Sequence, residues 1–148
     1  MPRNQKDQSR DLLIEPHASL DTGLADSIGA SLAQMDPWLT LGYPAQGLSR
    51  ELTAPHPDLT RFLATRGGEV EGLAVVRRPW LLGAYIELFA VLPAAQRRGV
   101  GRTMLHHLED EYRERTRNLW LLVFAFNTPA RRLYESEQTG TGANRDRP

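Results

Sequence analysis

Apolar and polar residues follow two different periods along this chain, and the change of period predicts where helices give way to strands. Early in the chain, apolar residues recur every four positions over 19–35, which predicts an amphipathic helix that ends at Asp36-Pro37. The stretch "PWLTLGYPAQG" that follows is typical of a long, partly apolar loop, and we expect a short helix over about 48–53. Residues 1–11 are polar, so we expect no fixed structure there. The stripe of the long helix consists of Leu20, Leu24, Ile28 and Leu32.

Strand-like stretches begin after these helices. "LTRFLATR" (59–66) and "VEGLAVVRR" (70–78) are separated by "GGE", which predicts an antiparallel hairpin. "AYIELFAVL" (84–92) predicts a third strand that is apolar enough to be buried on both faces, and Pro93 ends it. "LWLLVFAF" (119–126) predicts another central strand.

Two further helices alternate with these strands. Residues 99–117 predict an amphipathic helix, and "NTPARRLYE" starts another with Thr128 as the expected cap and Pro129 in the first turn. The fold class is therefore α/β: a mixed, mostly antiparallel sheet with helices on both faces. We expect a single domain over 1–135 and a disordered polar tail over 136–148. The apolar stripe of the helix over 99–117 is Val100, Met104, Leu108 and Tyr112.

Composition limits the partners that this chain could have. Its 148 residues, 41% of them hydrophobic, suit one domain with one core. Eighteen basic residues balance eighteen acidic ones, so nothing in the net charge indicates nucleic acid or an anionic membrane as a partner. The absence of cysteine excludes a disulfide scaffold, a thiolate metal site and a cysteine nucleophile. Without a signal-like start or an apolar run of about 18 residues, the chain is expected to be cytoplasmic.

The four histidines have no spacing that suggests a metal site. His106 and His107 are adjacent in a helical stretch, where neighbours do not share a face, so we expect both to be solvated. No metal is therefore expected.

The stretch "PAAQRRGVGRTML" (93–105) combines glycines with arginines between a buried strand and an apolar helix. A helix start carries unpaired N–H groups and the positive end of the helix dipole, and glycine lets the backbone approach a ligand closely. The combination predicts a cradle for an anion, with phosphate as its usual guest. A Walker A loop is excluded because no lysine follows at the required spacing. A dinucleotide fingerprint is excluded because Met104 stands where its third glycine belongs.

This stretch, Q-R-R-G-V-G-R after "ELFAVLP", resembles the acetyl-CoA-binding motif [QR]-x-x-G-x-[GA] of the GNAT superfamily of N-acetyltransferases. "NTPARRLYE" matches the later N-x-x-A-x-x-L-Y-E element of that family, and Asn127 begins it at the expected distance. The resemblance covers roughly 59–135 and, more loosely, the helices before it. It implies acetyl transfer from acetyl-CoA to a primary amine by direct attack, with a small molecule or a peptide as the acceptor.

The resemblance also implies a set of cofactor contacts. Backbone groups of Val91 or Leu92 would bind the pantetheine arm and the acetyl carbonyl where the sheet opens, and Asn127 would contact the same arm. The backbone N–H groups of one loop would hold the pyrophosphate. That loop consists of Gln96, Arg97, Arg98, Gly99, Val100, Gly101 and Arg102.

Two residues are candidates for proton transfer. Tyr134 would donate a proton to the leaving thiolate in the family's manner; the alternative is a core tyrosine on an apolar helix face. Glu87 would accept the amine proton, because it is the one acid in a strand that otherwise looks buried; the alternative is an ion pair with an arginine. Trp38 and Tyr43 would either line an acceptor pocket or pack their own loop.

The chain departs from the family after the L-Y-E element. The family continues with a Gly-aromatic pair and two more strands, whereas "SEQTGTGANRDRP" has no alternating apolar pattern. We therefore expect a sheet that lacks its last two strands, as in a truncated or frameshifted chain. The strand over 119–126 would then be an open edge through which the protein could form a homodimer. The alternatives to catalysis are a non-catalytic CoA-binding remnant and, less in keeping with the motifs, a binder of some other phosphate ligand.

Overall fold

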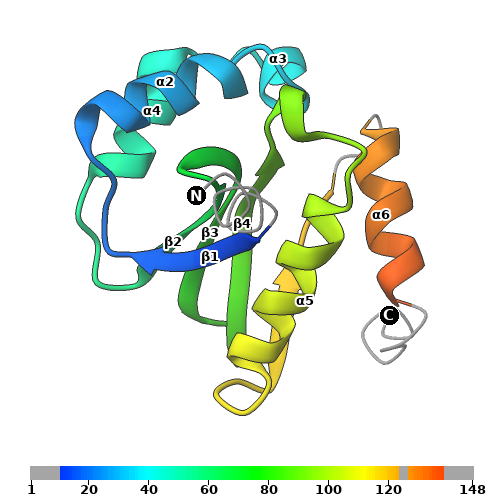
Figure 1. Cartoon of the computed structure of the whole chain (residues 1–148). Helices are drawn as coiled ribbons and strands as arrows, with labels where there is room; N and C mark the ends of the chain where they lie inside the picture. Colours follow the sequence, from blue (N-terminus) through cyan, green and yellow to red (C-terminus); the bar gives the residue numbers. More distant parts are fainter. Residues whose placement is uncertain (1–10, 124–126, 139–148) are drawn as a thin grey trace, which may run out of the picture.

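The computed structural model describes residues 11–123 and 127–138, and the described part forms one five-stranded sheet in the order β1-β2-β3-β4-β5 (Figure 1). Neighbouring strands from β1 to β4 are antiparallel, whereas β5 runs parallel to β4. The mixed, mostly antiparallel sheet expected from the sequence is therefore confirmed. The strands are β1 (Leu12–His17), β2 (Leu59–Arg66), β3 (Glu69–Trp80), β4 (Gly83–Val91) and β5 (Asn118–Leu121).

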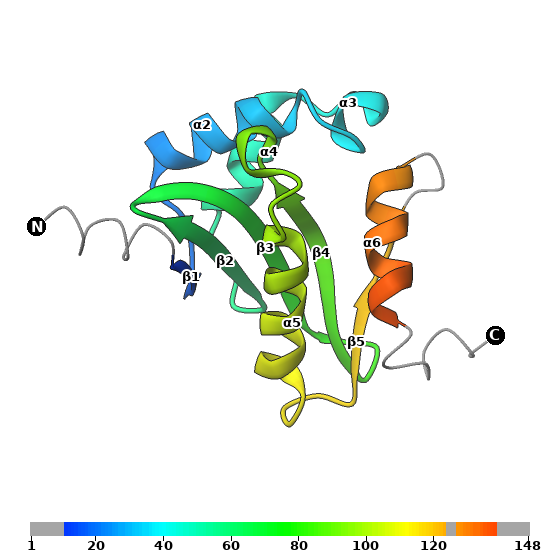
Figure 2. The ribbon, with the colours of Figure 1, turned by 45° about the vertical axis from the view of Figure 1, so that its right-hand side comes forward.

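Helices lie on both faces of this sheet, as predicted. The pair α2 and α4 packs on one face and α5 on the other, while α6 lies at the β5 end of the sheet (Figures 1 and 2). The helices are α2 (Thr22–Leu32), α3 (Trp38–Leu41), α4 (Ala45–Thr53), α5 (Val100–Tyr112) and α6 (Thr128–Gln138), with a short 3-10 turn η1 (Pro93–Ala95) before α5.

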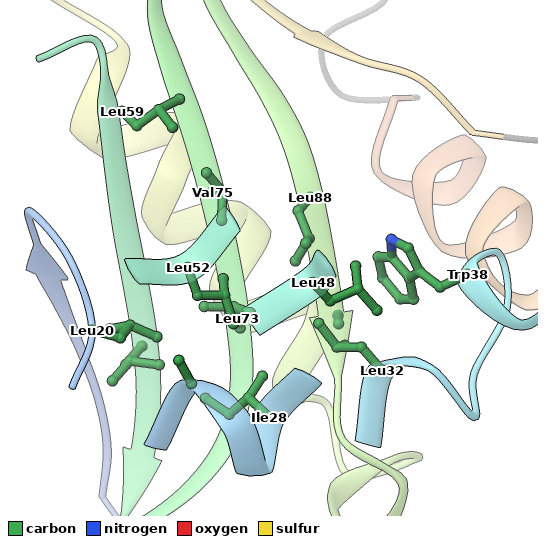
Figure 3. Packing of buried hydrophobic residues seen from close by; sticks show 13 residues of the cluster. Leu20, Ile28, Leu32, Trp38, Leu48, Leu52, Leu59, Leu73, Val75 and Leu88 are labelled. Carbon is green, nitrogen blue, oxygen red and sulfur yellow. The ribbon is translucent and has the colours of Figure 1, made fainter. Parts of the chain in front are cut away.

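The first core lies between the α2–α4 pair and the sheet (Figure 3). Side chains from both helices meet Leu73, Val75 and Leu88 of the central strands. Gly29 lets the two helices approach closely, because a β-carbon there would stand 3.1 Å from the backbone nitrogen of Ser49. The glycine that weakens α2 as an isolated helix is thus what allows α4 to pack on it.

The second core lies under α5. All four residues of its predicted stripe are at most 4% exposed, and they pack on the opposite face of the sheet. Burying each of these side chains is worth roughly 1.5–3 kcal/mol, which is ample to hold a three-turn helix in place. The stripe predicted from the spacing of apolar residues is therefore confirmed.

A buried arginine joins the α2–α4 pair to β2. The Arg61 side chain is fully buried, and its guanidinium donates to the backbone carbonyls of Ala18, Glu51 (2.5 Å) and Ala54 (2.7 Å). Two of these carbonyls belong to the last turn of α4 and the residue after it, which have no helical partner of their own. Arg61 thus satisfies the end of a helix that would otherwise bury unpaired acceptors.

The N-terminal half differs in detail from the sequence prediction. The helix expected over 19–35 is confined to α2, where the Asp21 side chain accepts from the Leu24 N–H (3.3 Å) and fixes its start. Leu12–His17, for which the sequence pattern predicts neither helix nor strand, forms β1. The stretch taken for a loop contains α3 and the start of α4, so α4 begins at Ala45 rather than near residue 48.

Corrections also apply near the C-terminal end. The strand expected over 119–126 is only β5, which ends at Leu121; residues 124–126 lie outside the described part of the chain. The Arg131 N–H donates to the Asn127 carbonyl (3.0 Å), so Asn127, not Thr128, takes the cap position of α6. The same helix continues to Gln138, beyond the expected domain end at Glu135. Residues 1–10 and 139–148, expected to lack structure, lie outside the described residues.

Candidate functional site

The sheet opens between β4 and β5. The two strands pair only from Gly83–Ile86 to Asn118–Leu121, and they diverge beyond that stretch (Figure 2). The Leu92 N–H donates to the Glu71 carbonyl of β3 (2.9 Å). Because backbone groups alternate in direction along a strand, Val91 and Phe89 direct theirs to the opened side. No described strand pairs with that stretch of β4 on the β5 side. There the Val91 carbonyl accepts from Gln96 Nε2 (3.0 Å), and the other backbone groups are available to an extended ligand.

The start of α5 lies beside this opening. Gly99 adopts a left-handed conformation (φ 80°) and caps the helix without a side-chain hydrogen bond. The first hydrogen bond of the helix runs from the Thr103 N–H to the Gly99 carbonyl (3.1 Å). Within the described residues, the preceding N–H groups of Val100, Gly101 and Arg102 therefore have no backbone acceptor. Such groups at the positive end of a helix dipole favour an anion.

A cavity of about 710 Å³ extends from this helix start to α6 and to the chain between α2 and α3. We call it the glycine-loop cavity. A nearby helix face, Ala130, Leu133 and Tyr134 of α6, forms its far wall. Most of the residues that the motif predicted for cofactor binding line it: Val91, Gln96, Arg97, Gly99, Val100, Gly101, Arg102 and Asn127.

Two predicted cofactor residues lie elsewhere. The Leu92 N–H is already bonded to β3, and its side chain packs against the first core. The Arg98 guanidinium donates to Glu71 Oε2 (2.8 Å) instead of facing the cavity. The Leu92 N–H and the Arg98 guanidinium thus each have a protein partner, and their contact with a cofactor stays a prediction.

The two remaining arginines of the loop differ in whether their guanidinium groups have an acidic partner. Arg102 Nε lies 2.6 Å from Glu137 Oε2 of α6. Arg97 lines the cavity and, within the described residues, takes part in no ion pair. Its backbone is left-handed (φ 67°), which is uncommon for a residue with a side chain. Arg97 is therefore the cation best placed to meet an anionic ligand.

A second cavity of about 480 Å³ lies on the other side of β4. We call it the aromatic cavity, because Trp38, Tyr43, Tyr85 and Phe89 line it together with the carboxylates of Glu51 and Glu87. Trp38 also belongs to the first core, so it packs as well as lining a cavity, whereas Tyr43 is half exposed; their role in an acceptor pocket stays a prediction.

The two cavities share a wall. Its residues are Trp38, Phe89, Asn127, Ala130 and Tyr134. The Tyr134 side chain is buried and its ring meets the edge of Phe89, with 5.7 Å between ring centroids. Burial raises the pKa of the Tyr134 hydroxyl, so the phenol keeps its proton at neutral pH. A tyrosine that keeps its proton thus forms part of the wall of both cavities.

Glu87 lies at a β-bulge in β4. Val75 of β3 pairs with Leu88 and Val76 pairs with Ile86, which leaves Glu87 as the extra residue. Its Oε1 accepts from Arg77 Nε at 2.8 Å, and this hydrogen bond raises the pKa of the Arg77 guanidinium. The ion pair weighed as the alternative from sequence is present. The bulge nevertheless places the carboxylate in the wall of the aromatic cavity.

Helix α6 is attached to α5 by contacts that the sequence analysis missed. The Glu137 carboxylate binds both Arg102 (2.6 Å) and the Nε2 atom of His106. His106, expected to be solvated only, is thus a partner of α6, although it stays half exposed. Glu137 stood in the stretch taken for a disordered tail; the helix-forming residues that follow "LYE" were the available signal.

Comparison with known families decides what this arrangement is. The model of the acetyltransferase (GNAT) family matches residues 30–138, a range that includes the glycine loop, both cavities and α6. The chain belongs to the GNAT family. The resemblance expected from its two motifs is confirmed.

Relatives of this GNAT chain include the ribosomal protein bS18-alanine N-acetyltransferase of Escherichia coli, 41% identical over 76 residues, which make up 51% of this chain and 51% of that protein. The chain thus spans about half the length of the curated relatives that it matches. The crystal structure of an Escherichia coli enzyme of that name has a TM-score of 0.65 and 28% identity, and the match covers 85% of this chain and 76% of that one.

More distant structures share the fold. An aminoglycoside acetyltransferase from an uncultured soil metagenomic sample has a TM-score of 0.63 at 19% identity, with 84% of this GNAT chain and 86% of that chain covered. An acetyltransferase of Thermus thermophilus has a TM-score of 0.67 at 19% identity, with 84% of each chain covered. In the part of our chain that the structure describes, no helix is long and apolar enough to cross a membrane.

Proposed function

We propose that this protein transfers the acetyl group of acetyl-CoA to a primary amine by direct attack. The observation that carries this proposal is the position of Tyr134 in the wall shared by the two cavities. One cavity has the charge and open backbone of a donor site, and the other has the aromatic and carboxylate side chains of an amine site. A proton donor in the wall between donor and acceptor is what acetyl transfer needs at the leaving sulfur.

The residues present fit acetyl-CoA. The unpaired N–H groups at the start of α5, with Arg97, would hold the pyrophosphate. A β-carbon at Gly99 would meet no protein atom within 4 Å, so the space above the loop is open to a ligand. The backbone groups of Phe89 and Val91 on the side that faces away from β3 would hydrogen-bond the pantetheine arm, and Asn127 would contact it from the start of α6. Acetyl-CoA supplies the activated acetyl group and a thiolate leaving group.

The protein's own residues manage two protons of the reaction. A cationic amine must lose one proton before its nitrogen can attack the acetyl carbon, and we assign that proton to Glu87, directly or through water. The nitrogen loses a second proton to water once the bond to the acetyl carbon has formed. Arg77 occupies Oε1 of this carboxylate, which leaves Oε2 for the amine side. As the carbon–sulfur bond breaks, Tyr134 gives its proton to the sulfur. No acyl-enzyme is needed, in keeping with a chain that has no cysteine.

The aromatic cavity supports an amine acceptor of modest size. Aromatic rings and carboxylates both line it, an environment that binds a cationic amine by cation–π and charge contacts. The relative that is 41% identical is named for acetylating an alanine of ribosomal protein bS18, and a structural neighbour is an aminoglycoside acetyltransferase. A peptide that begins with alanine and an aminoglycoside are therefore the first two acceptors to compare.

Calorimetric titration with acetyl-CoA, with ATP as the control ligand, tests the donor site. We expect binding of acetyl-CoA alone; equal binding of ATP would indicate a general phosphate site. Release of free thiol in the presence of each acceptor then tests transfer. Binding of acetyl-CoA without any thiol release would support the second candidate function, a CoA-binding module that does not catalyse.

We also propose that the outer edge of β5 mediates self-association. In the described part of the chain β5 pairs with β4 alone, and Leu122 beside it is 76% exposed. The edge is shorter than the sequence suggested, so we expect a weak dimer. Sedimentation velocity over a range of concentrations tests this, with Leu122→Lys expected to keep the protein monomeric.

A further inference from the structure

Glu71 is a buried acid close to the glycine loop that neither the motifs nor the proposed chemistry uses. It is 7% exposed and lies on β3. Ala64 of β2 pairs with Gly72 and Thr65 pairs with Val70, so Glu71 is the extra residue of a β-bulge. A carboxylate this buried is costly unless it is paired and hydrogen-bonded.

The partners of Glu71 lie at the two ends of one loop. Its backbone carbonyl accepts from the Leu92 N–H (2.9 Å), at the end of β4. Its Oε2 accepts from the Arg98 guanidinium (2.8 Å), one residue before Gly99. Its Oε1 accepts from Arg66 Nε (3.1 Å), which anchors the carboxylate to β2. A single residue of β3 thus holds both ends of the loop over 92–98.

Apart from Ala95, which is 3% exposed and packs in the second core, the loop has little else to fix its shape. Its own hydrogen bonds are short-range: the Ala95 N–H donates to the Leu92 carbonyl (2.9 Å), and Gln96 Nε2 donates to the Val91 carbonyl (3.0 Å). Arg97 and Gly99 both have positive φ, and for an arginine that backbone state costs free energy. The strained segment is held in place from outside.

We infer that Glu71 is a positioning residue for acetyl-CoA: it holds the loop in the shape in which the amides of 97–102 face the ligand. This inference rests on the proposed binding of acetyl-CoA in the glycine-loop cavity. A loop already held in its binding shape loses less conformational entropy when the ligand binds, so affinity rises without a direct contact. Arg98 then serves as the tether of the loop, which explains why it faces away from the cavity.

Because Glu71 is charged, the direction in which its substitution changes the affinity for acetyl-CoA distinguishes an anchor from a background charge. A negative group close to an anion site weakens binding of the anion by repulsion. If Glu71 were only a background charge, its neutralisation would therefore raise the affinity for acetyl-CoA. Loss of the loop's anchor weakens binding instead. Glu71→Gln keeps the size of the side chain and removes its charge. Glu69→Gln makes the same charge change at an exposed position of the same strand and is the matched control.

The first experiment measures the dissociation constant of acetyl-CoA by calorimetry for the wild type, Glu71→Gln, Arg98→Met, the double variant and Glu69→Gln. We expect each of the first two variants to bind roughly tenfold more weakly, as the loss of a charged hydrogen bond in a loop anchor implies, with Glu69→Gln unchanged. The double variant should bind about as weakly as either single one, because both changes break the same link. Unchanged or tighter binding by Glu71→Gln, or losses that add in the double variant, would overturn the inference.

The second experiment measures amide hydrogen exchange over 96–101 in the protein without ligand. Faster exchange in Glu71→Gln and Arg98→Met, but not in Glu69→Gln, supports the anchor; equal exchange in all of them overturns it. This readout separates the two proposals, because a wild type that does not bind acetyl-CoA refutes the proposed function alone. Arg98→Met keeps the pair of Glu71 with Arg66, so it decides the matter if circular dichroism shows Glu71→Gln to be unfolded.

Discussion

Gly101 of α5 lies against Leu133 of α6: a β-carbon at position 101 would stand 3.1 Å from Leu133 Cδ2. The same β-carbon would stand 3.4 Å from Val91 Cγ2. The second glycine of the motif therefore makes room for a helix, whereas the first, Gly99, leaves open space for a ligand. Two glycines two positions apart serve different purposes, and substitutions at each should fail in different ways.

Gly101→Val should displace α6 and with it Tyr134. We expect a loss of about 1–3 kcal/mol in the free energy of unfolding, from overpacking against Leu133, together with slower acetyl transfer. Chemical denaturation and thiol release measure the two effects. Adding Leu133→Ala should restore part of the turnover by making space. A Gly101→Val protein with the stability and rate of the wild type would show that α6 does not depend on this contact.

Gly99→Glu should abolish acetyl-CoA binding while leaving the fold intact. The new side chain meets no protein atom, so the loss comes from a carboxylate in the anion cradle and from a left-handed backbone (φ 80°) that glutamate adopts poorly. Calorimetry should show at least a hundredfold weaker binding. Gly99→Asn is the control, because asparagine tolerates this conformation and adds no charge. Retained affinity in Gly99→Glu would refute the assignment of the loop.

Tyr134→Phe should slow the chemical step and spare donor binding. The ring keeps its contact with Phe89, and only the hydroxyl that donates the proton is lost. We expect kcat to fall by about 100-fold, within the range of a lost general acid, and the dissociation constant of acetyl-CoA to stay within about twofold. Tyr112→Phe, in the second core and outside both cavities, is the matched control. Equal losses of kcat and affinity would mean that Tyr134 only packs.

The pairing of Glu137 should make the attachment of α6 depend on pH. A hydrogen bond from Arg102, which has the larger effect, and one from His106 lower the pKa of this carboxyl below its usual 4.5 in the folded protein. A depressed folded pKa stabilises the fold above the unfolded pKa, and the contribution disappears as the pH falls through the folded value.

Glu137→Gln should therefore lower the melting temperature near neutral pH, and the difference should shrink as the pH falls below the usual glutamate pKa and vanish below the lowered pKa of Glu137. Because both partners are half exposed, the effect is small and shrinks in high salt. Melting curves across this pH range measure it, with Glu135→Gln, on the exposed side of α6, as the control. A constant difference at all pH values would show that the ion pair is not its cause.

Features carried by apolar spacing could be predicted from the sequence. The α5 stripe ending at Tyr112 is buried as its four-residue period required, and β2 has the bounds of its strand-like run. Boundaries were missed where that signal is weak. In β1, Pro16 interrupts a short alternation, and the strand depends on pairing with β2 and on packing against the second core, both of which involve distant segments. In β5, the apolar run goes on after the pairing with β4 has stopped.

Residues whose role depends on partners far along the chain could not be predicted. Glu71 and Arg61 look like surface charges in sequence, yet both are buried because distant backbone and side-chain groups surround them. The same reason explains why the pairing of the Arg98 side chain with Glu71 could not be predicted, since this side chain could equally have joined the phosphate cradle. A motif identifies the backbone that binds the ligand more reliably than it identifies which side chains face it.

The bulge at Glu87 also determines how β4 is aligned with β3. Ile86 belongs to the core under α5 and Leu88 to the core under α2 and α4, so the strand changes faces at this one residue. The residues beyond it are apolar on both faces, and a slip by one position would bury a similar set of side chains. Hydrophobicity alone therefore leaves two alignments of β4 almost equivalent. The contact of Glu87 with Arg77 belongs to the bulged alignment, and a chain without Glu87 would lose the charged pair that favours this alignment over the other.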